Sequence, residues 1–114
     1  MRIEIKARKV AVTDELRQRV EKRFEKIAKQ VSPLSELEVL LSEDTKRPAA
    51  ESQIAEVTLR LKGKTLRSTN SAANHTTAVN ATAEDLGRQV KKLKAKRSHR
   101  RDSAPQVATD VAAL

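Results

Sequence analysis

The stretch DLGRQVKKLKAKRSHRR, residues 85–101, holds the longest run of basic residues in the chain. Its lysines and arginines are Arg88, Lys91, Lys92, Lys94, Lys96, Arg97, Arg100 and Arg101. Ammonium and guanidinium groups bind phosphate oxygens through charge-assisted hydrogen bonds. Leu86, Val90 and Leu93 recur at the spacing of one helical face, which indicates an amphipathic helix. The stretch therefore predicts a helix whose exposed side binds polyanions.

A second basic band is expected on an earlier helix. Its members, spaced three, four and three residues apart, are Arg19, Lys22, Lys26 and Lys29. This spacing puts them on one helical flank, whereas Glu21 and Glu25 fall on a separate band. Either band alone is typical of a solvated helix face. Two bands on two helices, with the acids sorted elsewhere, favour a binding surface.

Phe24 is the only aromatic residue, and its helical spacing assigns it to the core. Stacking of bases on aromatic side chains, which many readers of single-stranded nucleic acid use, is therefore not expected. Recognition of phosphates and of overall shape remains, and this suits structured RNA.

No set of residues points to catalysis, a metal or a cofactor. The chain has no cysteine, and His75 and His99 have no carboxylate or thiol partners at ligand spacing. Gly63 and Gly87 are the only glycines, which excludes a glycine-rich phosphate loop. The acids are scattered and form no catalytic constellation. We predict a protein that is not an enzyme, with no catalytic residues, no metal site and no cofactor.

The overall composition restricts the class of protein and partner. A length of 114 residues suffices for one domain with a modest core. The 24 Lys+Arg against 15 Asp+Glu give a net charge of +9, which favours nucleic acid or an anionic membrane surface. No apolar run approaches the length of a membrane span, and the N-terminal MRIEIKARKV alternates instead of forming a signal-peptide core. We expect a soluble, cytoplasmic protein without a membrane partner.

Hydrophobic periodicity predicts the elements that carry these bands. Strands are expected at residues 1–8, 36–44, 53–63 and 65–69, and helices at about 14–30 and 73–99. The order β-α-β-β-β-α indicates an α+β domain in which both helices pack on one face of a four-stranded sheet. A right-handed crossover through the first helix makes the first two strands parallel if they are neighbours.

Three segments resemble the bacterial ribosome hibernation-promoting factor and ribosome-associated inhibitor family. They are VTDELRQRVEKRFEKI (12–27), AEVTLRLKGKTLRS (55–68) and EDLGRQVKKLKAK (84–96). The resemblance extends over residues 1 to about 100. It implies a domain that sits on the small ribosomal subunit, in the mRNA channel and the A and P tRNA sites, and that blocks translation during stress or stationary phase.

In that family, basic residues on both helices face ribosomal RNA. The matching positions here, which we predict to bind RNA together with Arg97 beside them, are Lys22, Lys26, Lys29, Arg88, Lys91, Lys92, Lys94 and Lys96. The main alternative is a basic module for other structured RNA, or a nucleic-acid-binding regulator that is not specific to ribosomes.

The start of the second helix departs from the family. Members usually have an acidic pair followed by Met-Tyr-Ala-Ala-Ile-Asp, whereas this chain has ANHTTAVN at residues 73–80. His75 and Thr76 replace the two large side chains, and the acids are lost, which predicts weaker packing at the helix start and a more basic surface. Asn74 and Asn80 match glycosylation patterns, but without a secretory signal they are expected to be helix-cap and helix-face residues.

The chain is expected to divide into a ribosome-binding domain, residues 1–101, and a flexible C-terminal tail, residues 102–114. The tail is too short for the second, dimerising domain that the long hibernation factors carry. It also lacks the acidic run often found in the short factors that prevent ribosome pairing, so the sequence does not separate promotion from prevention of pairing. With no long apolar surface patch, the free protein is predicted to be a monomer.

Overall fold

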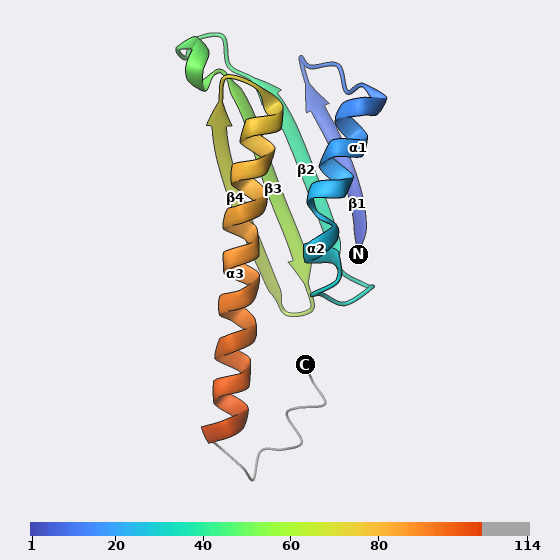
Figure 1. Cartoon of the computed structure of the whole chain (residues 1–114), viewed down its shortest axis with the longest axis vertical. Helices are drawn as coiled ribbons and strands as arrows, with labels where there is room; N and C mark the ends of the chain where they lie inside the picture. Colours follow the sequence, from blue (N-terminus) through green and yellow to red (C-terminus); the bar gives the residue numbers. More distant parts are fainter. Residues whose placement is uncertain (104–114) are drawn as a thin grey trace.

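The helices and strands follow in the order that the sequence predicts (Figure 1). A computed structural model describes the backbone of residues 1–103 and the side chains of residues 1–96. The elements are β1 (Arg2–Arg8), α1 (Asp14–Arg23), α2 (Glu25–Ala28), β2 (Glu36–Glu43), the short 3-10 helix η1 (Ala49–Glu51), β3 (Gln53–Leu61), β4 (Lys64–Ala72) and α3 (His75–Ser103). The tail predicted at residues 102–114 lies almost entirely outside the described residues.

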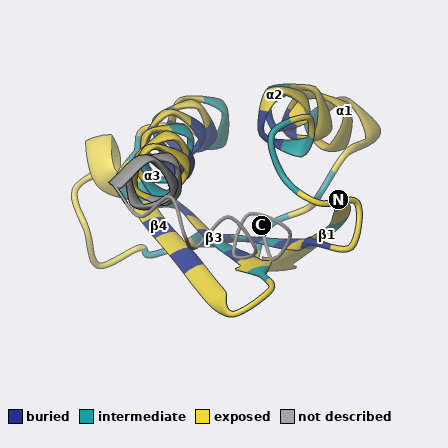
Figure 2. Cartoon of the chain, turned by 90° about the horizontal axis from the view of Figure 1, so that it is seen from below, coloured by how far each residue is buried: buried dark blue, intermediate teal, exposed yellow. Residues whose placement is uncertain are grey.

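The strands form one mixed sheet in the order β1-β2-β3-β4. β1 and β2 are parallel, and the other neighbouring pairs are antiparallel. Gly63 has a positive φ of 74° in the turn between β3 and β4, a conformation that favours glycine. Figure 2 shows α1, α2 and α3 on the same face of the sheet. The predicted α+β fold, with its β-α-β-β-β-α order and parallel first pair of strands, is confirmed.

The core lies between the sheet and this helical layer. Its buried side chains from the strands include Leu37, Val39, Leu41, Ala55, Val57, Leu59 and Leu66, and those from the helices include Val20, Phe24, Ile27, Ala78, Val79, Ala83, Leu86 and Val90. Alternate strand residues point into this layer because successive side chains of a strand face opposite sides. The opposite face of the sheet is open.

The first helix differs from its prediction by a break at Phe24. One helix was expected over residues 14–30, whereas α1 ends at Arg23 and α2 begins at Glu25. The backbone hydrogen bonds continue across the break, because the Phe24 amide donates to the Val20 carbonyl at 3.2 Å and the Ala28 amide donates to the Phe24 carbonyl at 3.0 Å. The two segments therefore act as one support for the basic band.

The start of α3 is anchored by polar contacts rather than by large side chains. The Asn74 side chain accepts a hydrogen bond from the Thr77 amide at 2.8 Å, which makes Asn74 the predicted cap. Nε2 of His75 donates to the Ser42 carbonyl of β2 at 3.0 Å. The buried Thr82 hydroxyl donates to the Ala78 carbonyl at 2.8 Å. The His75 contact joins the first turn of α3 to β2, and the Asn74 and Thr82 contacts stabilise the helix itself.

The C-terminal part of α3 extends past the end of the sheet (Figure 1). Among the described side chains, Val90 is the last buried residue of the helix and Leu93 is the last that packs against the core. Residues 94–103 add about 15 Å of helix at a rise of 1.5 Å per residue. The segment therefore presents its lysines away from the core.

Candidate nucleic-acid interface

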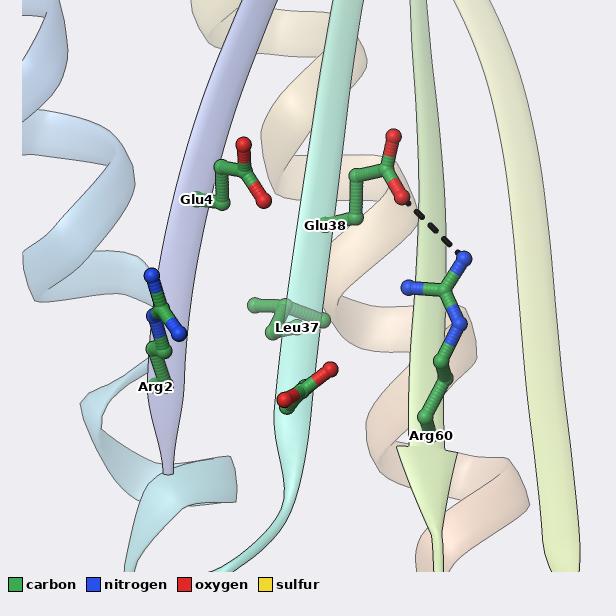
Figure 3. A pocket seen from close by; sticks show the side chains of 6 residues that line it. Arg2, Glu4, Leu37, Glu38 and Arg60 are labelled. Atoms are coloured by element: carbon green, nitrogen blue, oxygen red, sulfur yellow. Dashed lines mark hydrogen bonds and ion pairs between the residues drawn. The ribbon is translucent and has the colours of Figure 1, made fainter.

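Several charges on the open face of the sheet pair with one another. Glu38 of β2 accepts from Arg60 of β3 at 3.2 Å, and its other oxygen lies 3.3 Å from the Lys6 ammonium of β1. Figure 3 shows Arg2, Glu4, Glu38 and Arg60 side by side on this face around a small depression of about 70 Å³. Opposite charges facing one another across strands leave little net charge for a polyanion.

The pairing of Glu38 predicts a dependence of stability on pH. Hydrogen bonding from Lys6, and then from Arg60, lowers the pKa of Glu38 below its ordinary value of 4.5. The unfolded chain therefore binds a proton at a higher pH than the folded chain does. This contribution to the free energy of unfolding is complete above the unfolded pKa and is lost as the pH falls through the lowered folded value.

We therefore expect Glu38→Gln to flatten the loss of stability between about pH 6 and pH 3, measured by urea unfolding with circular dichroism. Glu36→Gln is the matched control, because Glu36 is exposed on the same strand and has no ion pair among the described residues. If Glu38→Gln and Glu36→Gln flatten the pH dependence of stability equally, the ion pairs of Glu38 contribute no more than any exposed carboxylate.

The helical layer, in contrast, contains a basic groove between α1 and α3. It has a volume of about 470 Å³ and is lined by Arg19, Lys22, Arg23, Glu25, Lys26, Thr76 and Asn80. Arg23 reaches across to Glu84 of α3 at 3.6 Å, and Arg19 pairs with Glu15 on its own helix at 2.7 Å. Within residues 1–96, no carboxylate lies within ion-pair distance of Lys22 or Lys26. The groove therefore holds two unpaired lysines and a net positive charge. Glu25, expected on a separate band from the cations, lines the same groove.

The basic stretch of α3 is the second concentration of charge. Lys91, Lys92, Lys94 and Lys96 are exposed, and none of them pairs with a carboxylate of residues 1–96. Arg88 is also exposed but lies 3.8 Å from Asp85. Exposed cations without partners are free to bind phosphates, and such contacts make affinity depend strongly on salt.

The predicted residues fall into two groups in the structure. Lys22 and Lys26 meet at the groove, whereas Lys29 lies beyond them as the residue that caps the end of α2. The five predicted residues from Arg88 to Lys96 lie further along α3, and Lys94 and Lys96 follow Leu93, the last described residue that packs against the core. The side chain of Arg97 lies outside the described residues.

Sequence reasoning missed three residues of the groove as candidate ligands. Arg23 directly precedes the buried Phe24, and its place at the groove follows from the packing of α1 against α3. Thr76 and Asn80 are one helical turn apart, but neither residue type indicates a binding role by itself. For Thr76 and Asn80, the only indication in the sequence was that residues 73–80 depart from the family pattern.

Other kinds of site were searched for in the described part of the chain. Residues 1–96 contain no group of three or more histidines and acids that could hold a metal ion. No described helix combines the length and apolar character needed to cross a bilayer.

Comparison with known proteins agrees with this fold. The family model described as "Sigma 54 modulation protein / S30EA ribosomal protein" matches residues 3–98. The structure is similar to the crystal structure of the Thermus thermophilus Protein Y N-terminal domain, at 26% identity and a TM-score of 0.70, over 82% of this chain and 99% of that one. A search of curated proteins finds no match.

A ribosomal subunit interface protein from Coxiella burnetii has the same fold. The TM-score is 0.67 and the identity 19%, over 83% of this chain and 99% of the other. The family match includes α1, α2, β2, β3 and β4 and most of β1 and α3. The chain therefore belongs to the Sigma 54 modulation protein / S30EA ribosomal protein family, which includes the hibernation-promoting factors and consists of ribosome-binding translation regulators.

Proposed function

We propose that this protein is a ribosome hibernation factor that binds the small ribosomal subunit near the decoding centre and inhibits translation under stress or in stationary phase. The observation that carries the proposal is the separation of charge between the two faces. Lys22, Lys26 and the lysines of α3 have no acidic partner among residues 1–96, whereas on the open face Glu38 pairs with both Lys6 and Arg60. The helical face therefore offers ribosomal RNA the larger concentration of unpaired cations.

The family and its relatives support a ribosomal partner. The similar protein from Coxiella burnetii is named as a subunit interface protein. A domain bound through its helices to RNA of the mRNA channel and the A and P sites would exclude mRNA and tRNA by occupying their space. Inhibition then requires binding alone and no chemical step.

Binding to ribosomes is tested by co-sedimentation of the protein with purified small subunits and whole ribosomes. We expect binding to small subunits, protection of decoding-region nucleotides from chemical probes, and inhibition of a cell-free translation system. Arbitrary duplex RNA in equal mass should compete poorly. Equal affinity for ribosomes and duplex RNA would instead favour a general module for structured RNA.

We further propose that the protein acts in the cytoplasm and is a monomer when free. Leu34 is the only large hydrophobic residue that is exposed among the described side chains, so no extended apolar patch favours a dimer there. Light scattering at micromolar concentration tests the oligomeric state, and a stable dimer would contradict the proposal.

A further inference from the structure

The two walls of the basic groove differ in chemistry. The α1 and α2 wall carries four cations, Arg19, Lys22, Arg23 and Lys26, and one carboxylate, Glu25. The α3 wall presents a hydroxyl from Thr76 and an amide from Asn80, and its nearest charge is Glu84, one turn further on, which pairs with Arg23. Much of the surface between these polar ends is carbon, as expected where long basic side chains lie along a protein surface. A ligand that matches the groove has a negative end, an apolar body and a hydrogen-bonding edge.

We propose that the groove binds one unpaired ribonucleotide, with its phosphate against the α1 cations and its ribose or base edge against Thr76 and Asn80. This inference rests on the proposed function in taking RNA as the ligand, and it adds which part of the RNA enters the protein. An amide offers both a donor and an acceptor to a base edge, and a hydroxyl can pair with the ribose 2′-OH.

The size of the groove favours a single nucleotide over a duplex. A volume of about 470 Å³ lies within the range of sites that take small molecules. The groove lies between two helices, each about 10–12 Å across with its side chains. A nucleic-acid duplex is wider than either helix, so it would contact only the outer surfaces of α1 and α3 and would not enter the groove. A nucleotide splayed out of a loop or bulge can enter, and structured RNA supplies such nucleotides.

Arg23 is placed to take part because the protein leaves its guanidinium incompletely satisfied. Its ion pair with Glu84 is 3.6 Å long, beyond the 2.7–2.9 Å typical of a charge-assisted hydrogen bond. Its Nε is buried and has no hydrogen-bond partner among the described residues. A phosphate in the groove would supply a better acceptor for the terminal nitrogens of this side chain, which is 35% exposed. A guanidinium plane can also stack on a base where no aromatic side chain exists.

The test fills the groove without removing charge. Thr76→Tyr places a large ring between α1 and α3, whereas Thr77→Tyr puts the same ring on an exposed position of the same helical turn. The full chain is titrated against labelled single-stranded RNA, single-stranded DNA and duplex RNA of one sequence, followed by fluorescence anisotropy. We expect Thr76→Tyr to weaken binding of single-stranded RNA about tenfold. Thr77→Tyr should change it by less than about twofold.

Asn80→Ala provides a second variant, because Asn80 is exposed and its truncation leaves the core intact. Loss of its hydrogen bonds should weaken binding of single-stranded RNA about fivefold and leave duplex binding within about twofold. A preference for RNA over DNA that Thr76→Tyr abolishes would further support contact with the ribose. If adenosine monophosphate displaces the labelled strand, a single nucleotide is sufficient to fill the groove, which would also support the proposal.

Two results would overturn the inference. They are equal effects of Thr76→Tyr and Thr77→Tyr on single-stranded RNA, and an equal loss of duplex and single-strand binding in Thr76→Tyr. Binding to small subunits is measured in parallel with the same variants. Groove-dependent strand binding without subunit binding would contradict the proposed function and leave this inference standing. If the protein binds small subunits and Thr76→Tyr and Thr77→Tyr bind single-stranded RNA equally, the proposed function stands and this inference is wrong.

Discussion

Replacing both Lys91 and Lys92 with alanine is expected to lower the affinity for small ribosomal subunits on the order of 30-fold at ~0.1 M salt. Both ammonium groups are exposed on α3 and have no acidic partner among residues 1–96. Each phosphate contact contributes about 0.7 to 0.9 to the slope of log affinity against log salt, so losing two contacts lowers that slope by about 1.4 to 1.8. A salt series of co-sedimentation measurements provides both quantities.

The control removes the same charge from the opposite face of the sheet. Arg2→Ala combined with Arg67→Ala also removes two positive charges. Both side chains are exposed on the open face, so the core is left intact. If the RNA lies on the helical face, this variant keeps nearly the full salt slope. An equal drop in both double variants would mean that net charge alone sets the affinity, and a salt-independent affinity would exclude an electrostatic interface.

The strands were predictable where one face is apolar. Ile3, Ile5 and Ala7 alternate with charges in β1, although Ile3 and Ile5 are only half-buried and Ala7 is exposed. β2 and β3 show the same period with a fully buried face. β4 was predicted too short, over residues 65–69, because its continuation to Ala72 is polar. Ser68 is buried and Asn70 donates to the Thr82 hydroxyl of α3 at 3.2 Å. Polar residues that face a helix give no alternation of hydrophobicity to detect.

The candidate site was predictable within each helix but not between helices. Spacing places Lys22 and Lys26 on one flank because the period of an isolated helix determines it. The groove depends on how closely α1 approaches α3, which the packing of the buried Phe24, Val79 and Ala83 determines. Nothing in the local sequence reports that distance, so Arg23, Thr76 and Asn80 were recognisable as groove residues only in three dimensions.

Phe24→Ala is expected to have the largest effect on folding, lowering the free energy of unfolding by about 3–5 kcal/mol. Phe24 is the only aromatic residue, has 0% exposure, and lies at the junction of α1 and α2. Total stabilities of small domains are about 5–15 kcal/mol, so the loss is a large fraction of the whole. Urea unfolding measures it by circular dichroism, because the chain has no tryptophan or tyrosine for fluorescence.

Two further variants separate the cavity left by Phe24 from a general loss of apolar surface. Phe24→Leu keeps most of the buried volume and should cost about 1–2 kcal/mol. Leu34→Ala removes a side chain that is 91% exposed and should change stability by less than about 0.5 kcal/mol. Because Phe24 holds α1 against the core beneath the groove, Phe24→Leu should also weaken binding of single-stranded RNA more than Leu34→Ala does. A cost of Phe24→Ala no larger than that of Leu34→Ala would show that the α1 and α2 segments are not packed as described.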